Sequence, residues 1–151
     1  MLRLLKLFRR TAEQRMIRRY SELRALSTFE ERFDYLRLAG IVGNSTFGYD
    51  RYLNQILYHD AEWKRARNIV IARDNGCDLG VPGFEIFDKV IVHHMNPITM
   101  EMINERDPKV FDPEYLITVS HRTHNAIHYG TDTRSIKGPT VRTKNDTCPW
   151  K

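Results

Sequence analysis

The chain has 151 residues, of which 41% are hydrophobic and 11% aromatic, enough to bury a core and to exclude a wholly disordered protein. Lys and Arg outnumber Asp and Glu by 24 to 19, and the net charge of +5 suits a polyanionic partner without establishing one. No stretch approaches the roughly 20 apolar residues that a membrane span needs, so we expect no membrane partner. Cys77 and Cys148 are too few for a disulfide framework, and we expect a reduced cytoplasmic protein.

The first part of the chain is its most basic segment. Residues 1–24 hold eight basic side chains against two acidic ones, so the positive charge of the chain is concentrated there. We expect a basic helical arm that contacts phosphates without reading bases, and the alternative is a solvated helix face. Residues 1–59 as a whole are predicted to be a basic N-terminal helical region, to which no family function is assigned.

Three helices are predicted in the first half of the chain. Ser27–Glu31 combines an N-cap with a carboxylate three residues on, and apolar residues then recur at helical spacing until Gly40. A short helix is expected at Arg51–Tyr58. Asp60 is expected to cap a third helix, which runs to the turn at Asp74–Gly76.

Beyond that turn the pattern changes from helical to strand-like. Phe84–Phe87 and Lys89–Val92 are rich in β-branched and aromatic residues and predict two strands, and Thr99–Arg106 predicts a short helix. Leu116–Val119 is apolar, and Ser120 is placed to cap a final helix. The predicted class is therefore α+β, with N-terminal helices followed by a β-hairpin and a helix. The side chains expected to hold the core are Trp63, Ile69, Val70, Phe84, Ile86, Val90 and Val92.

Five of the six histidines lie close together in the second half, at positions 93, 94, 121, 124 and 128. His124 and His128 are one turn apart on the predicted final helix, so both imidazoles project from one face and can bind one metal ion. Such a pair is also common on protein surfaces. His93 and His94 end a predicted strand, where one side chain can face the helix and its metal while the other points toward a substrate. Three histidine ligands leave coordination positions open for water or phosphate.

The segments Val92–Pro97 and Glu114–Gly130 resemble HNH endonucleases, and the closing HxxxH and glycine are similar to the nuclease domain of DNase colicins. Trp63–Leu79 resembles the lead-in helix and turn of phage-encoded HNH endonucleases. The resemblance covers residues 60–130, which it identifies as an HNH endonuclease domain with a ββα-metal (His-Me finger) core, followed by a polar tail at 131–151. It implies cleavage of DNA phosphodiester bonds, by nicking or double-strand cutting, in a phage-encoded protein.

The resemblance assigns roles to four histidines. His94 matches the general base, and His93 matches the metal ligand that precedes it. His124 matches the last ligand of the motif, and His128 matches the additional ligand of the colicin type. The implied cofactor is one divalent metal ion and no small molecule. Three imidazoles favour Zn²⁺, Mn²⁺ or Ni²⁺, whereas an acidic residue in place of His93 favours Mg²⁺.

Two features depart from the family pattern. The central Asn of the motif, which braces the loop that carries the base, falls on Tyr115, whose hydroxyl cannot make a two-sided amide contact. Asn96 is the candidate to brace the loop instead. The second departure is that the positions of a zinc knuckle lack its cysteines, so no structural zinc is expected. These positions are Cys77, Gly80, Ser120 and Thr123.

Three arginines are predicted to hold the scissile or flanking phosphates, namely Arg122, Arg73 and Arg134. His121 is expected to be solvent-exposed or to contact phosphate. Two other functions remain open at this stage. One is a DNA-binding protein that keeps the HNH fold with weak or no cleavage, for which Tyr115 is the reason. The other is a protein that binds RNA or another partner through its basic arm and holds a purely structural metal.

Overall fold

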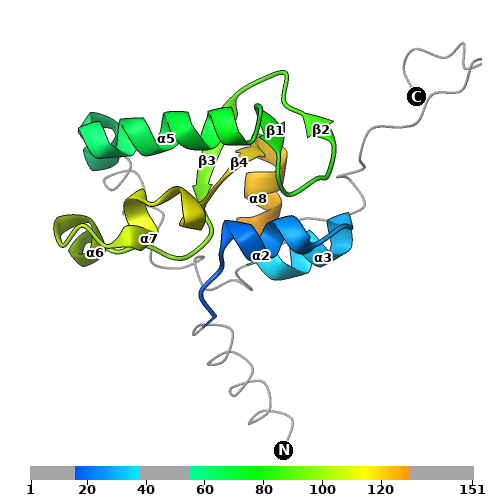
Figure 1. Cartoon of the computed structure of the whole chain (residues 1–151), viewed down its shortest axis with the longest axis horizontal. Coiled ribbons are helices and arrows are strands. Elements are labelled where there is room, and N and C mark those ends of the chain that lie inside the picture. The colour runs from blue at the N-terminus through cyan, green and yellow to red at the C-terminus, as the bar shows by residue number, and fades with distance from the viewer. Residues whose placement is uncertain (1–15, 38–54, 130–151) are drawn as a thin grey trace, which may run out of the picture.

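The computed structural model describes residues 16–37 and 55–129, which contain helices and short antiparallel strands (Figure 1). The first helices are α2 (Tyr20–Ala25), α3 (Phe29–Leu36), a helical stretch at 55–59 and α5 (Ala61–Arg73). The strands are β1 (Cys77–Asp78), β2 (Phe84–Glu85), β3 (Val90–His94) and β4 (Leu116–Ser120). The later helices are α6 (Met100–Asn104), α7 (Pro108–Phe111), the 3-10 turn η1 (Pro113–Tyr115) and α8 (His121–Tyr129). The α+β class predicted from the sequence is confirmed.

Two helices begin at the capping residues that the sequence predicts. The Thr28 hydroxyl accepts a hydrogen bond from Glu31 N at 3.2 Å, and the Glu31 carboxylate accepts one from Thr28 N at 3.1 Å, which completes a capping box at α3. The Asp60 carboxylate accepts from two backbone N–H groups at the start of α5. α3 ends at Leu36, whereas the predicted end at Gly40 lies outside the described residues.

The strand pairing differs from the predicted hairpin. β3 pairs antiparallel with β4, and His93 lies opposite Ile117, while β1 and β2 form a separate two-stranded ladder. The two runs predicted as successive strands therefore take partners elsewhere in the chain. Gly83 has a φ of 75°, a left-handed conformation that helps the chain to turn back from β1 into β2. The partner of β3 is the apolar strand β4, which follows α6, α7 and η1 in the chain.

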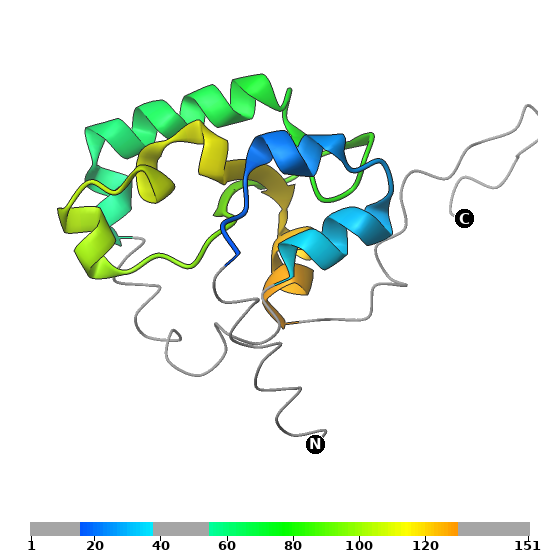
Figure 2. The ribbon, with the colours of Figure 1, turned by 60° about the horizontal axis from the view of Figure 1, so that its bottom comes forward.

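The β3–β4 ladder lies between two groups of helices, as Figures 1 and 2 show from two directions. A separate apolar cluster packs on each face of the ladder. Helices α5, α6 and α7 cover one face, where the buried side chains are Leu57, Trp63, Ala66, Val70, Ile103, Val110, Phe111 and Leu116. Helices α2, α3 and α8 cover the other, where the buried side chains are Leu23, Leu36, Met95, Ile117, Val119 and Ile127. Side chains alternate along a strand, so successive residues of β3 contribute to different clusters.

The predicted core is confirmed in part: Trp63, Val70 and Ile86 are buried, and Val92 packs against a core cluster. Ile69 was expected to be buried and is 54% exposed. α5 buries Trp63, Ala66 and Val70, which follow one stripe of the helix, and residue 69 lies about 100° around the helix axis from residue 70. Of the other predicted core residues, Ile86 is buried and Phe84, Val90 and Val92 are half-buried.

The N-terminal region packs as part of the same structure. Leu23 of α2 and Leu36 of α3 have no exposed surface and share a cluster with Ile117 and Ile127. The expected boundary at residue 59 therefore does not separate the described helices 16–37 from the second half of the chain. The arm before residue 16 and the predicted tail at 131–151 lie outside the described residues.

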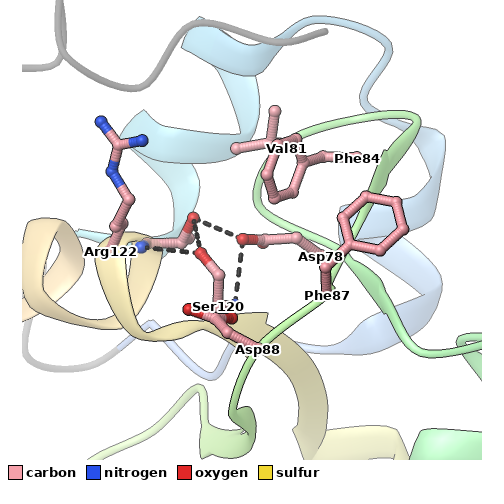
Figure 3. Close-up of a pocket in the computed structure, with 8 residues that line it drawn as sticks. Asp78, Val81, Phe84, Phe87, Asp88, Ser120 and Arg122 are labelled. Atoms are coloured by element: carbon pink, nitrogen blue, oxygen red, sulfur yellow. Dashed lines mark hydrogen bonds between the residues drawn. The ribbon is translucent and has the colours of Figure 1, made fainter.

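A buried carboxylate, Asp78, lies among the positions that the sequence resemblance compares with a zinc knuckle. Asp78 is 2% exposed and accepts hydrogen bonds from Gly80 N (2.9 Å), Ser120 N (3.0 Å) and Thr123 Oγ1 (2.6 Å) (Figure 3). The Ser120 hydroxyl in turn accepts from Thr123 N at 3.2 Å, which caps α8. Three of the four positions compared with a zinc knuckle, namely Gly80, Ser120 and Thr123, thus bond to Asp78. These hydrogen bonds join β1 to β4 and α8, where no structural zinc is expected.

We expect Gly80→Ala to destabilise the protein by about 1–3 kcal/mol, because the new Cβ would overlap Thr123 Cγ2. Thr123 is 1% exposed and its hydroxyl is bonded to Asp78, so it cannot rotate away. Adding Thr123→Ser removes Cγ2 and keeps the hydroxyl, and should recover most of the loss. Urea denaturation of the two single variants and the double variant measures this coupling. Additive losses would show that the two residues do not clash.

Candidate metal centre

Three histidines from β3 and α8 meet on one side of the ladder. His93 is on β3, and His124 and His128 are one turn apart on α8. The imidazole centroids lie 5.3 Å apart for His93 and His124, 5.1 Å for His93 and His128, and 4.4 Å for His124 and His128. One potential ligand atom from each residue lies within 4.8 Å of the other two. The structure therefore brings together the three side chains predicted as metal ligands.

The chemistry of His93 fits a metal ion. Its side chain is 3% exposed, and its Nε2 atom makes no hydrogen bond within the described residues. A buried polar atom without a partner is costly, and coordination would satisfy it. Burial lowers the pKa of His93 well below its ordinary value, and the nearby imidazoles of His128 and His124 lower it further. Burial also lowers the pKa of His128. Low pKa values keep imidazoles neutral, which is the form that binds metal.

His94 lies on the other face of the ladder and is not one of this set. Its ring stacks on Trp63 of α5, with centroids 4.8 Å apart and planes at 15°. Its Nε2 atom is 3.1 Å from the Val110 carbonyl oxygen. Because a carbonyl only accepts, Nε2 carries the proton and Nδ1 is the ring's acceptor. Burial lowers the pKa of His94 to about 4, so its imidazole is neutral at pH 7.

The side-chain amide of Asn96 joins the loop after His94 to the backbone of Arg18. Asn96 is 5% exposed, its Oδ1 accepts from Arg18 N at 2.8 Å, and its Nδ2 donates to Arg18 O at 2.9 Å. Next to it, Met95 N donates to the Tyr115 carbonyl at 3.1 Å. The Tyr115 side chain is half-buried, with the Arg19 guanidinium 6.0 Å from its ring centre. Residue 115 thus braces the loop through its backbone.

Arg18 also belongs to this region. The side chain is 4% exposed, and it donates from Nε to Tyr35 O at 2.6 Å and from Nη2 to Arg37 O at 3.1 Å. Its positive charge also contributes to the low pKa of His93. An arginine within a basic segment is normally exposed, so no pattern in the sequence marks Arg18 as buried.

The predicted phosphate-binding arginines have different surroundings. Arg122 is exposed in the first turn of α8, two residues before His124. Arg73 donates to Asp74, to the carbonyls of residues 113 and 116, and lies 3.6 Å from the ring centre of Tyr20. We therefore assign Arg73 to the scaffold, where it joins α5 to η1 and β4. Arg134 lies outside the described residues, and His121 is exposed.

The comparisons with known proteins add no identification. No protein-family model, curated protein or solved structure matches the chain. Among the described helices, none is long and apolar enough to span a bilayer.

We expect His124→Ala and His128→Ala each to weaken metal binding by at least about 100-fold, because two imidazoles form a poor cage for one ion. Titration calorimetry with Zn²⁺ measures the change. The matched control is His121→Ala, which removes an exposed imidazole from the same helix and should leave the affinity unchanged. Full affinity in either ligand variant would remove that residue from the site.

Proposed function

We propose that the protein is a metal-dependent endonuclease of the HNH type, which hydrolyses DNA phosphodiester bonds. The observation that carries the proposal is the set of three imidazoles on the β3–β4–α8 unit, with the neutral His94 next to His93 in the chain. The strands β3 and β4 are antiparallel, and α8 follows β4 directly. This arrangement, with candidate ligands on β3 and α8, is what a ββα-metal core, implied by the sequence resemblance, would require.

In this function His94 is the general base. The Val110 carbonyl fixes the proton on Nε2, so Nδ1 is the nitrogen that takes a proton from the attacking water. A pKa of about 4 makes a weak base in the free protein. A phosphate beside the ring raises that pKa, because a negative charge favours imidazolium, and brings the group closer to the operating pH.

The other groups hold the substrate and the ion. His93, His124 and His128 would bind the metal, which supplies a positive charge that stabilises the negative charge developing on the phosphate. In this proposal Arg122, exposed in the first turn of α8, would hold a phosphate that flanks the cleaved one. Asn96 positions the loop next to His94 through its two hydrogen bonds to Arg18. The net charge of +5 favours a polyanionic substrate.

We expect His94→Ala and His94→Phe to slow the relaxation of supercoiled plasmid by about 10²- to 10⁴-fold, with metal affinity unchanged. The second variant keeps a ring against Trp63, so a melting measurement separates loss of the base from loss of packing. EDTA should abolish relaxation by the wild type, and Mg²⁺, Mn²⁺, Zn²⁺ and Ni²⁺ are then added back in turn. The matched control is His59→Ala, which removes an exposed imidazole.

The relaxation assay, run beside measurements of DNA and RNA binding, separates the candidate roles. Unchanged cleavage in both His94 variants would make His94 part of the scaffold. A parallel loss of metal affinity would make it a ligand. Binding of DNA by the wild type, without cleavage in any metal, would favour a DNA-binding protein that keeps the HNH fold. Binding of RNA in preference to DNA, without cleavage, would favour a structural metal.

A further inference from the structure

One side of α5 faces away from the rest of the protein. Figures 1 and 2 show this helix at the edge of the molecule. Its inner side buries Trp63, Ala66 and Val70. The outer face consists of exposed residues that recur at intervals of three and four along the helix, namely Ala61, Lys64, Arg65, Asn68 and Ala72.

The outer face of α5 is positively charged within an acidic part of the chain. Residues 55–129 hold eight basic and eleven acidic side chains, a net charge of −3. The side chains of Lys64 and Arg65 make no ion pair or hydrogen bond within the described residues, and the half-buried Arg67 adds a third such cation. Other basic side chains of this region are bound to carboxylates, and these pairs are Arg73 with Asp74, Arg106 with Asp60 and Glu62, and Lys109 with Asp107.

The acidic side chain of α5 does not cancel this charge. Glu62 lies 3.4 Å from the Arg106 guanidinium, which also binds Asp60 at 2.6 Å. The carboxylates at the start of the helix are thus matched by a cation from outside it. The positive charge of Lys64 and Arg65 remains available to an anion.

Short side chains separate the two exposed cations. Successive residues of an α-helix lie about 100° apart around its axis, so Lys64 and Arg65 flank a strip between them. The strip consists of Ala61, Asn68 and Ala72. Two methyl groups let an extended backbone approach the helix closely. The Asn68 amide makes no hydrogen bond within the described residues, and it can donate to a phosphate oxygen.

This face suits duplex DNA better than a single strand. A duplex carries one negative charge for about each 1.7 Å of its axis, so neighbouring cations can each meet a phosphate. Proteins that bind single strands add aromatic side chains on which the bases stack. The aromatic residue of α5, Trp63, is buried, and the exposed rings of Tyr58 and Phe87 (59% and 87%) lie outside this helix.

We propose that the outer face of α5 binds the sugar–phosphate backbone of duplex DNA through Lys64, Arg65 and Asn68. The choice of DNA as the polyanion rests on the proposed nuclease function. The face points away from Trp63, on which the His94 ring stacks, so the phosphates bound here are distinct from the one that is cut. Contacts to phosphates carry no sequence information, and this surface holds any duplex alike.

The test compares two double variants that lose the same charge. Lys64→Gln with Arg65→Gln removes both exposed cations of the face, and glutamine keeps a similar helix propensity. Arg24→Gln with Lys89→Gln is the matched control, because both side chains are exposed, make no ion pair within the described residues and lie elsewhere on the surface. The probe is a fluorescein-labelled DNA duplex. Binding is measured by fluorescence anisotropy in EDTA, so that no cleavage intervenes, at about 50 and 200 mM salt.

The salt dependence gives the expected result. Each phosphate contact contributes about 0.9 to the slope of log K against log salt, so the α5 double variant should lower the size of that slope by about 1.8. Its loss of affinity should therefore be about 10-fold larger at the lower salt concentration than at the higher one. The control should keep a slope close to that of the wild type. The losses should be equal for two unrelated duplex sequences, and the melting temperatures should not move.

Asn68→Ala tests the same face without a change of charge. Loss of the amide donor should weaken duplex binding by about 10-fold and leave the salt slope unchanged. Asn104→Ala, which removes an exposed amide from α6, is the matched control and should bind as the wild type does. Full affinity in Asn68→Ala would remove that residue from the contact.

The outcomes separate this inference from the proposed function. Equal losses in the two double variants, or an unchanged slope in the α5 variant, would overturn the inference whether or not the protein cuts plasmid. A wild type that does not bind the duplex would also overturn it, and a larger loss for a single strand than for the duplex would overturn the choice of partner. A loss confined to the α5 variant, in a protein that cuts no DNA in any metal, would support the surface and overturn the nuclease proposal alone.

Discussion

The antiparallel ladder between β3 and β4 is the constraint on which the whole site depends. Its register sends His93 toward α8 and His94 toward α5, and a shift by one residue would exchange them. Two buried carboxylates help to fix β4 in place. Asp74 and Asp78 accept the N–H groups of Thr118 (2.8 Å) and residue 120 (3.0 Å), which face away from β3. Two imidazoles with low pKa values thus occupy adjacent positions on opposite faces of the ladder.

The sequence predicts well those features that depend on neighbouring residues. The caps at Thr28 and Asp60 follow from local patterns, and the structure contains both. The three-histidine cluster could also be predicted in part, because helical spacing alone puts His124 and His128 on one face of a helix. Only the approach of His93 required a tertiary assumption. The family resemblance supplied that assumption, and the described contacts agree with it.

Features that depend on distant parts of the chain left no readable pattern. Arg18 and Asn96 are 78 residues apart. Nothing in the sequence near either residue indicates that the arginine is buried, or that the asparagine side chain forms hydrogen bonds with the arginine backbone. The strand partner of β3 was misjudged for the same reason. Ile69 shows a different limit, since an apolar residue one position off a helical stripe is hard to distinguish from a core residue. Phe87 was counted as part of a strand, and its exposure follows only from the path of the chain after β2.

The burial of Leu23 and Ile127 in one cluster has a consequence for biosynthesis. Translation delivers α2 early and α8 late, so the three imidazoles cannot meet until α8 has left the ribosome. Contacts between such distant segments also form slowly, because a long loop must close first. The three-histidine cluster is therefore incomplete while the chain is still being translated. Under the proposed function, the nucleic acid near the ribosome would meet an assembled site only after the fold has closed.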